Sequence, residues 1–122
     1  MKTYEDVVAF LKQYVKAKYD IEYYRHKMEG LKAISYSEEE KGTSMQDTMS
    51  LYMQKIEFAE KVQKRVELFI ENKFEGLERN VLYGRYVECR SYKSIAKDIG
   101  YSVTHTQRLH ERAIHNYLAN HY

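Results

Sequence analysis

Four side chains between residues 103 and 108 have the chemistry needed to recognise base pairs in DNA. Gln107 can form two hydrogen bonds with adenine, and Arg108 can form two with guanine. Val103 and the methyl group of Thr104 can rest against the methyl group of thymine. These contacts require a helix that enters the major groove by its N-terminal end, so neighbouring residues must build and orient that helix.

Residues 92–114 show the pattern of a helix-turn-helix. Ile95 and Ile99 lie four residues apart and share one face of a first helix. Ala96 keeps this helix slim enough for a second helix to cross it closely. The pattern therefore predicts two short helices packed through these residues.

The turn and the second helix are predicted from the next residues. Gly100 is the place for a left-handed turn, which costs least in a residue without a Cβ atom. We expect Tyr101 to fill the corner and Ser102 to cap the second helix. Thr106 occupies a position that usually holds Val or Ile. Either its methyl group is buried with the hydroxyl bonded to a main-chain carbonyl, or the helix is rotated slightly. The inner face of this helix is predicted to hold Thr106, Leu109, Ala113 and Ile114.

A supporting helix is predicted upstream, between Leu77 and Ser91. Its apolar residues recur at helical spacing, at Leu77, Val81, Leu82 and Tyr86. Here the chain resembles the C-terminal DNA-binding region, region 4, of bacterial sigma factors, in which such a helix precedes a helix-turn-helix. The corresponding residues are Val81-Leu82, Arg85-Tyr86 and Leu109 to Ile114. Over its full length the chain is similar to small phage-encoded transcription regulators of the ArpU and RinA type, which join a helical N-terminal part to such a module.

The resemblance implies a set of DNA contacts and a biological setting. It implies that five residues face bases or nearby phosphates: Val103, Thr104, His105, Gln107 and Arg108. It also implies control of phage or prophage genes at promoter DNA in the bacterial host cell, with contact to host RNA polymerase. Primary sigma factors usually carry Arg and Glu at the first outward positions. This chain has Val103, Thr104 and His105 there, which argues against use of the usual promoter −35 sequence.

Cations near the motif are candidates for phosphate contacts. Lys93 and Ser94 open the first helix, where backbone N–H groups and a cation can hold a phosphate. Residues 77–122 hold seven Arg or Lys against four Asp or Glu, a net charge of +3, whereas residues 1–76 have a net charge of −1. This excess favours DNA binding, although a solvated helix surface also carries Arg and Lys. Other cations that can reach phosphates are Arg79, Arg85, Arg90, Lys97, Arg108 and Arg112.

The composition indicates an all-α fold of one domain or two small helical parts. The 122 residues include no Pro and five Gly, and the 31% of charged residues are spread along the chain. No apolar run approaches the roughly 20 residues that span a bilayer, and the N-terminus does not look like a signal peptide. We therefore expect a cytoplasmic protein without membrane contact. Cys89, the single cysteine, is most simply a small residue at a helix end.

Residues 1–76 are predicted to form a long, coiled-coil-like helical hairpin, followed by the helix-turn-helix unit of residues 77–122. Lys18 and Arg25 interrupt the first apolar stripe, which consists of Tyr4, Val7, Leu11, Tyr14, Ile21 and Met28. A polar loop is expected at Ser35–Ser44, and Asn72–Gly76 is expected to break the second helix and hinge it to the next unit. The second stripe consists of Met45, Met49, Tyr52, Ile56, Ala59, Val62, Val66 and Phe69.

Some apolar residues of the hairpin need a further surface to cover them. They could pack on the C-terminal unit, on a second copy in a homodimer, or on another protein such as polymerase. A homodimer would present two recognition helices to two half-sites. The residues concerned are Tyr19, Tyr23, Tyr24, Leu51, Phe58 and Leu68.

The sequence favours a binding protein over an enzyme. His110 and His115 lie in a segment that looks like the zinc-protease HExxH motif, but they are five residues apart and point roughly 140° apart on a helix. No phosphate-binding loop, nucleophile elbow or cysteine cluster is present, so we expect no catalysis, metal or cofactor. Two functions remain. One is a sequence-specific transcription regulator, and the other is an assembly or adaptor protein, such as a DNA-packaging recognition subunit or a polymerase-binding modulator.

Overall fold

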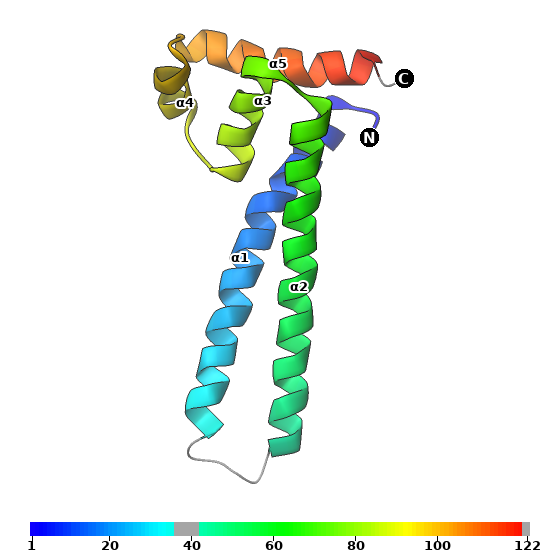
Figure 1. Ribbon diagram of the computed structural model, residues 1–122, viewed down its shortest axis with the longest axis vertical. Coiled ribbons are helices and arrows are strands. Elements are labelled where there is room, and N and C mark those ends of the chain that lie inside the picture. Colours follow the sequence, from blue (N-terminus) through cyan, green and yellow to red (C-terminus); the bar gives the residue numbers. More distant parts are fainter. Residues whose placement is uncertain (36–41, 121–122) are drawn as a thin grey trace. The chain divides into compact units, whose positions relative to one another are not determined.

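The computed structural model describes residues 1–35 and 42–120, with side chains for residues 1–32 and 45–120. Every regular element in these ranges is a helix (Figure 1), which confirms the all-α prediction. None of these helices is long and apolar enough to cross a membrane. The elements are α1 (Tyr4–Ser35), α2 (Gly42–Lys73), α3 (Gly76–Leu82), a π-helical turn (Tyr83–Val87), α4 (Tyr92–Ile99) and α5 (Val103–Asn120). Most of the loop predicted at Ser35–Ser44 lies outside the described residues.

The chain forms two compact units. The first, called here the motif unit, contains Met1–Val15 together with the chain from Lys64 onward. The second, called here the hairpin unit, contains Lys16–Gln63. The first turns of α1 and the last turns of α2 therefore share a unit with α3, α4 and α5.

Helices α1 and α2 run antiparallel, as predicted (Figure 1). In the motif unit the rings of Phe10 and Phe69 have centroids 5.1 Å apart. In the hairpin unit the rings of Tyr24 and Tyr52 are 5.5 Å apart. Residues later in α1 contact residues earlier in α2, which is the pattern of an antiparallel pair.

The predicted apolar stripe of α1 is buried or half-buried, and one further residue joins it. Lys18 and Arg25 are exposed, as the interruption of the stripe implied. Ala17, which the prediction omitted, is buried instead and packs with Ile21 and Ala59. A long cation cannot lose its hydration at such a contact, so the small neighbouring residue takes the inward position. All predicted members of the α2 stripe are buried or half-buried.

The core of the motif unit joins the helix pair to the last helices. Its buried members come from α1, α2, α3, the π-helical turn and α5, and Phe74 lies between α2 and α3. A smaller cluster of Val81, Ile95 and Leu109, with Ile99 packed against it, links α3, α4 and α5. Leu77, predicted to support this cluster, is 37% exposed at the start of α3. The main core cluster consists of Val7, Leu11, Val66, Ile70, Phe74, Leu82, Tyr86, Ala113 and Ile114.

The break predicted at Asn72–Gly76 is present, but it is anchored rather than a free hinge. α2 ends at Lys73 and α3 begins at Gly76, whose φ of 63° lies in the left-handed region. Between them, Phe74 is only 8% exposed and belongs to the main core cluster. Its ring packs against those of Phe69 and Tyr117, at 5.5 and 5.7 Å between centroids.

A π-helical turn follows α3, where the sequence predicted an uninterrupted helix. The N–H of Glu88 donates to the carbonyl oxygen of Tyr83 at 3.1 Å, five residues earlier. Within this turn Gly84 lies so close to α4 that a Cβ atom added there would be 3.1 Å from Cγ1 of Ile95. Cys89, two residues after the end of this turn, has a φ of 56° and is exposed. The absence of a side chain at Gly84 thus permits the close contact with α4.

Thr106 adopts the first of its two predicted arrangements. Its side chain is fully buried, and its hydroxyl donates to the carbonyl oxygen of Ser102 at 2.8 Å. That carbonyl also accepts the N–H of Thr106 at 3.0 Å, so it remains paired without the hydroxyl.

We expect Thr106→Val to change the free energy of unfolding by less than about 1 kcal/mol, because the methyl packing is kept. Thr106→Ser should lower it by about 1 kcal/mol, because a buried methyl group is lost. Urea unfolding of the two variants checks this order. A larger loss in the valine variant would show that the hydroxyl bond, rather than the methyl group, holds α5 in place.

Candidate nucleic-acid interface

Backbone hydrogen bonds hold the turn between α4 and α5. Gly100 has a φ of 78°, in the left-handed region that favours glycine. Its N–H and that of Tyr101 both donate to the carbonyl oxygen of Ala96, at 2.9 and 3.1 Å. Ser102 then caps α5, because its Oγ accepts the N–H of His105 at 3.0 Å. The turn and cap predicted at Gly100 and Ser102 are confirmed, and α4 and α5 form a helix-turn-helix.

The two sides of α5 differ in burial and chemistry. The inner side is buried and consists of Thr106, Leu109, His110, Ala113 and Ile114. Five of the predicted DNA contacts are exposed. Thr104, Gln107, Arg108 and Arg112 lie away from the inner side, and Val103 lies at the N-terminal end of the helix. Glu111 is exposed on the same side, one turn beyond Gln107. Polar contacts for a partner are therefore concentrated in the first two turns of the helix.

Tyr101 does not fill the corner, although the sequence predicted that it would. It is 46% exposed, and its ring lies against that of His105 with 4.6 Å between centroids. The corner is closed without it, because Ile95 and Leu109 already pack together with Ile99. The His105 ring is half-buried by this contact. Tyr101 thus adds an exposed aromatic side chain beside the start of α5, a feature that the sequence analysis missed.

Four exposed cations of the motif form no ion pair with the described residues. Lys93 and Lys97 lie four residues apart on α4, so they share one side of that helix. Neither they nor Arg108 and Arg112 make an ion pair with another described residue. These four charges are available to anionic groups outside the protein.

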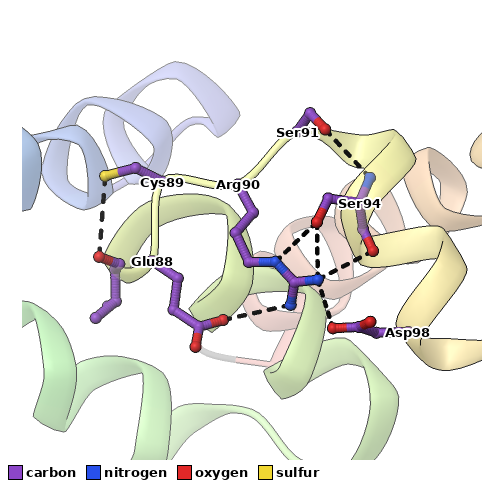
Figure 2. A network of polar contacts seen from close by, with 7 residues as sticks. Glu88, Cys89, Arg90, Ser91, Ser94 and Asp98 are labelled. Carbon is purple, nitrogen blue, oxygen red and sulfur yellow. Dashed lines mark hydrogen bonds and ion pairs between the residues drawn. The ribbon is translucent and has the colours of Figure 1, made fainter.

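Ser94 and Arg90 are occupied within the protein (Figure 2). The N–H of Ser94 donates to Oγ of Ser91 at 3.1 Å, which caps α4. Nε and Nη2 of Arg90 donate to Oγ of Ser94 at 3.0 and 2.8 Å, and Nη2 also donates to its carbonyl oxygen at 3.0 Å. Asp98 and Glu88 pair with the same guanidinium. The N–H and the hydroxyl of Ser94 are therefore engaged in fixing the start of α4, so the N–H of Ser94 is not free to hold a phosphate as expected.

Arg85 is likewise engaged inside the unit. Its guanidinium carbon lies 4.5 Å from the centroid of the Tyr92 ring, over the ring face. Its Nη1 donates to the carbonyl oxygen of Arg90 at 3.1 Å. Sequence spacing could not show this, because Arg85 meets Tyr92 only after the π-helical turn has bent the chain toward α4.

His110 is buried on the inner side of α5, where the sequence analysis did not place it. It is 4% exposed, and its Nε2 and Nδ1 lie 2.6 and 3.2 Å from the hydroxyl groups of Tyr86 and Tyr4. Burial, with a smaller contribution from the positive charge of Arg85, lowers the pKa of His110 to about 4. Burial also raises the pKa of Tyr86. The imidazole is therefore neutral at pH 7, with one nitrogen accepting and the other donating.

The described residues contain no group of three or more His, Cys, Asp or Glu side chains that could hold a metal ion. His115, the second histidine of the apparent zinc motif, stacks on Tyr4 with 5.2 Å between ring centroids. The fold and the exposed face of α5 define an all-α protein with a helix-turn-helix. Comparison with protein-family models, with curated proteins and with solved structures finds no match to this chain.

Proposed function

We propose that this protein binds double-stranded DNA in a sequence-specific manner and regulates transcription. The observation that carries the proposal is the exposed side of α5. Gln107, Arg108, Val103 and Thr104 are solvent-exposed on a helix whose opposite side is buried and whose start is capped by Ser102. The first turns of such a helix fit the major groove, and these four side chains match the donors, acceptors and methyl groups displayed there.

The other predicted contact residues have different roles in this proposal. Lys93, Lys97 and Arg112 contact phosphates and so position the protein without reading sequence. Ser94 acts indirectly, because it holds Arg90 and so fixes the start of α4. Tyr101 and His105 form a tilted ring pair at the edge of this interface.

The biological setting of the proposal comes from the sigma-like residue pattern. Val81-Leu82, Arg85-Tyr86 and Leu109 to Ile114 resemble the corresponding segments of sigma region 4 and of phage regulators of the ArpU and RinA type. We therefore infer action on phage or prophage promoters in the cytoplasm of a bacterial host, together with host RNA polymerase. The proposed function requires neither catalysis nor a cofactor.

The salt dependence of DNA binding tests the phosphate part of the proposal. Each neutralised phosphate contributes about −0.9 to the slope of log K against log salt concentration. We expect Lys93→Ala to weaken binding to all sequences alike and to make the slope shallower by about 1. Fluorescence anisotropy with mixed-sequence duplexes measures this, and Lys64→Ala, which removes an exposed lysine of α2, is the matched control. Equal slopes for the two variants would remove Lys93 from the interface.

The second candidate function is an assembly or adaptor protein that uses its helices for protein contacts. It is favoured by the exposed apolar side chains of the hairpin unit, among which Phe58 is 66% and Tyr19 is 64% exposed. A protein of this kind would show no preference among duplexes of different sequence at physiological salt. Anisotropy titrations that compare duplexes of different sequence therefore separate the two candidates.

A further inference from the structure

The hairpin unit has a small buried core and several exposed apolar side chains. Its buried core consists of Ala17, Ile21 and Ala59, with Ile56 and Val62 packed against it. Two of the three fully buried members are alanines, which contribute little to stability through burial. Larger side chains of the same unit are 48% to 66% exposed, namely Tyr19, Tyr23, Leu51, Met53 and Phe58. A two-helix pair with so small a core needs a further surface to be stable.

Two of these exposed side chains, Leu51 and Phe58, line one groove of this unit. The groove has a volume of about 330 Å³ and is lined by both helices. α2 contributes Leu51 and Phe58, which lie seven residues apart and so on the same side of the helix, at 48% and 66% exposure. α1 contributes Asp20 and Tyr24. The groove thus combines aromatic and apolar side chains with polar and charged ones.

The groove carries one charge of each sign, from different helices. Asp20 lies on α1, and Lys55 lies on α2 between Leu51 and Phe58. Nζ of Lys55 lies 5.9 Å from the centroid of the Tyr24 ring. A two-fold axis that passes between these two charges would set Asp20 of one copy near Lys55 of the other, twice. The surface is therefore complementary to itself in charge as well as in its apolar character.

The other side of the hairpin differs from the groove. There Arg25 and Glu60 form an ion pair between α1 and α2, with 3.8 Å between Nη2 and Oε2. Glu60 is two residues from Phe58, and Arg25 is five residues from Asp20. Helical spacing directs both of these side chains away from the groove. The side that carries this ion pair is thus charged, whereas the groove carries Leu51 and Phe58.

We propose that this groove is a homodimer interface, in which two hairpin units pack face to face as a four-helix bundle. Phe58 of each copy covers the groove of the other, and Leu51 lies beside it. The two Asp20–Lys55 pairs at the rim set the antiparallel register of the copies. The proposed dimer is a further property of the protein and does not depend on DNA binding. It would supply two recognition helices if α5 reads DNA.

The mass of the full-length protein in solution, without DNA, tests the proposal. Sedimentation velocity at concentrations up to roughly 100 µM should show twice 14.7 kDa. The double variant Leu51→Glu/Phe58→Glu should sediment as 14.7 kDa with unchanged helical circular dichroism, because both side chains are exposed in one copy. Met53→Glu is the matched control, since Met53 is 51% exposed on α2 but does not line the groove, and it should remain dimeric.

A charge exchange tests the register and excludes simple misfolding. Asp20→Lys and Lys55→Asp should each weaken the dimer by about tenfold or more, and the two together should restore it. A wild-type protein that stays monomeric at every concentration would overturn the proposal. So would a dimer that survives Leu51→Glu/Phe58→Glu. Because no DNA is present, failure here is distinct from failure of the proposed DNA binding.

Discussion

Acidification from pH 7 to about pH 4 is expected to lower the free energy of unfolding by about 3 kcal/mol through His110 alone. The imidazole contacts the hydroxyl groups of Tyr4, from α1, and Tyr86, from the π-helical turn. The Tyr92 ring, from α4, packs edge-on at 5.9 Å between centroids. A protonated ring would be a donor at both nitrogens, with the positive charge of Arg85 nearby and little water to stabilise it.

The direction of this effect follows from the lowered pKa. In the unfolded chain His110 takes up a proton near its usual pKa of 6.5, whereas in the folded protein it does so only near 4. Between these values the unfolded state binds more protons, so stability falls as the pH drops through this window. Each pH unit removes about 1.4 kcal/mol. Above about pH 6.5 this residue adds no pH dependence.

Urea unfolding of the wild-type protein and of His110→Gln between about pH 7 and pH 4 measures the effect. The variant should be less stable at pH 7, because it disturbs a buried pair of tyrosine contacts, but it should have a flatter profile in this window. His26→Gln, which replaces an exposed histidine of α1, should keep the wild-type profile. Parallel profiles of stability against pH for the wild-type protein and His110→Gln would contradict the assignment of this pH dependence to His110.

Replacing Arg108 with alanine is expected to reduce affinity for the specific DNA site by about 5-fold to 150-fold, or about 1 to 3 kcal/mol. The side chain is exposed in the second turn of α5 and pairs with no described carboxylate. It is therefore free to form two hydrogen bonds with guanine. The loss should be confined to one base pair, so preference there should relax while preference elsewhere is kept. Gln107→Ala should act in the same way at a neighbouring adenine.

Selection of bound duplexes from a randomised pool, with the wild-type protein and each variant, reads this out position by position. Lys93→Ala is the comparison, since loss of a phosphate contact lowers affinity without changing the preferred sequence. If Arg108→Ala and Gln107→Ala both left affinity and preference unchanged, α5 would not be the recognition helix.

The backbone of the motif could be predicted because its signals are local. Ile95, Gly100 and Ser102 each act within a few residues of their own position, through helical spacing, a left-handed turn and an N-cap. Thr106 could be narrowed to two arrangements by the same reasoning, and the structure has the first. The helix-turn-helix therefore followed from residue types and spacing alone.

The side-chain partners could not be predicted, because they come from distant parts of the chain. His110 is buried by Tyr4, which is 106 residues away, and no local pattern indicates that contact. Arg85 and Arg90 also looked like phosphate contacts, but they contact Tyr92 and Ser94 at the start of α4, because the chain turns between the π-helical turn and α4. Tyr101 was assigned to a corner that closes without it. The spacing of apolar residues predicts which face of a helix is buried. It does not predict which of several possible partners a polar or aromatic side chain contacts in the folded protein.

Sequencing of fragments captured from sheared DNA of the source genome, at roughly physiological salt, is the most direct test of sequence-specific binding through α5. The wild-type protein should recover one or a few fragments that share a short element, and Gln107→Ala/Arg108→Ala should lose this enrichment. Uniform recovery by the wild-type protein, or recovery of nothing, would contradict sequence-specific binding and favour an adaptor that acts through another protein.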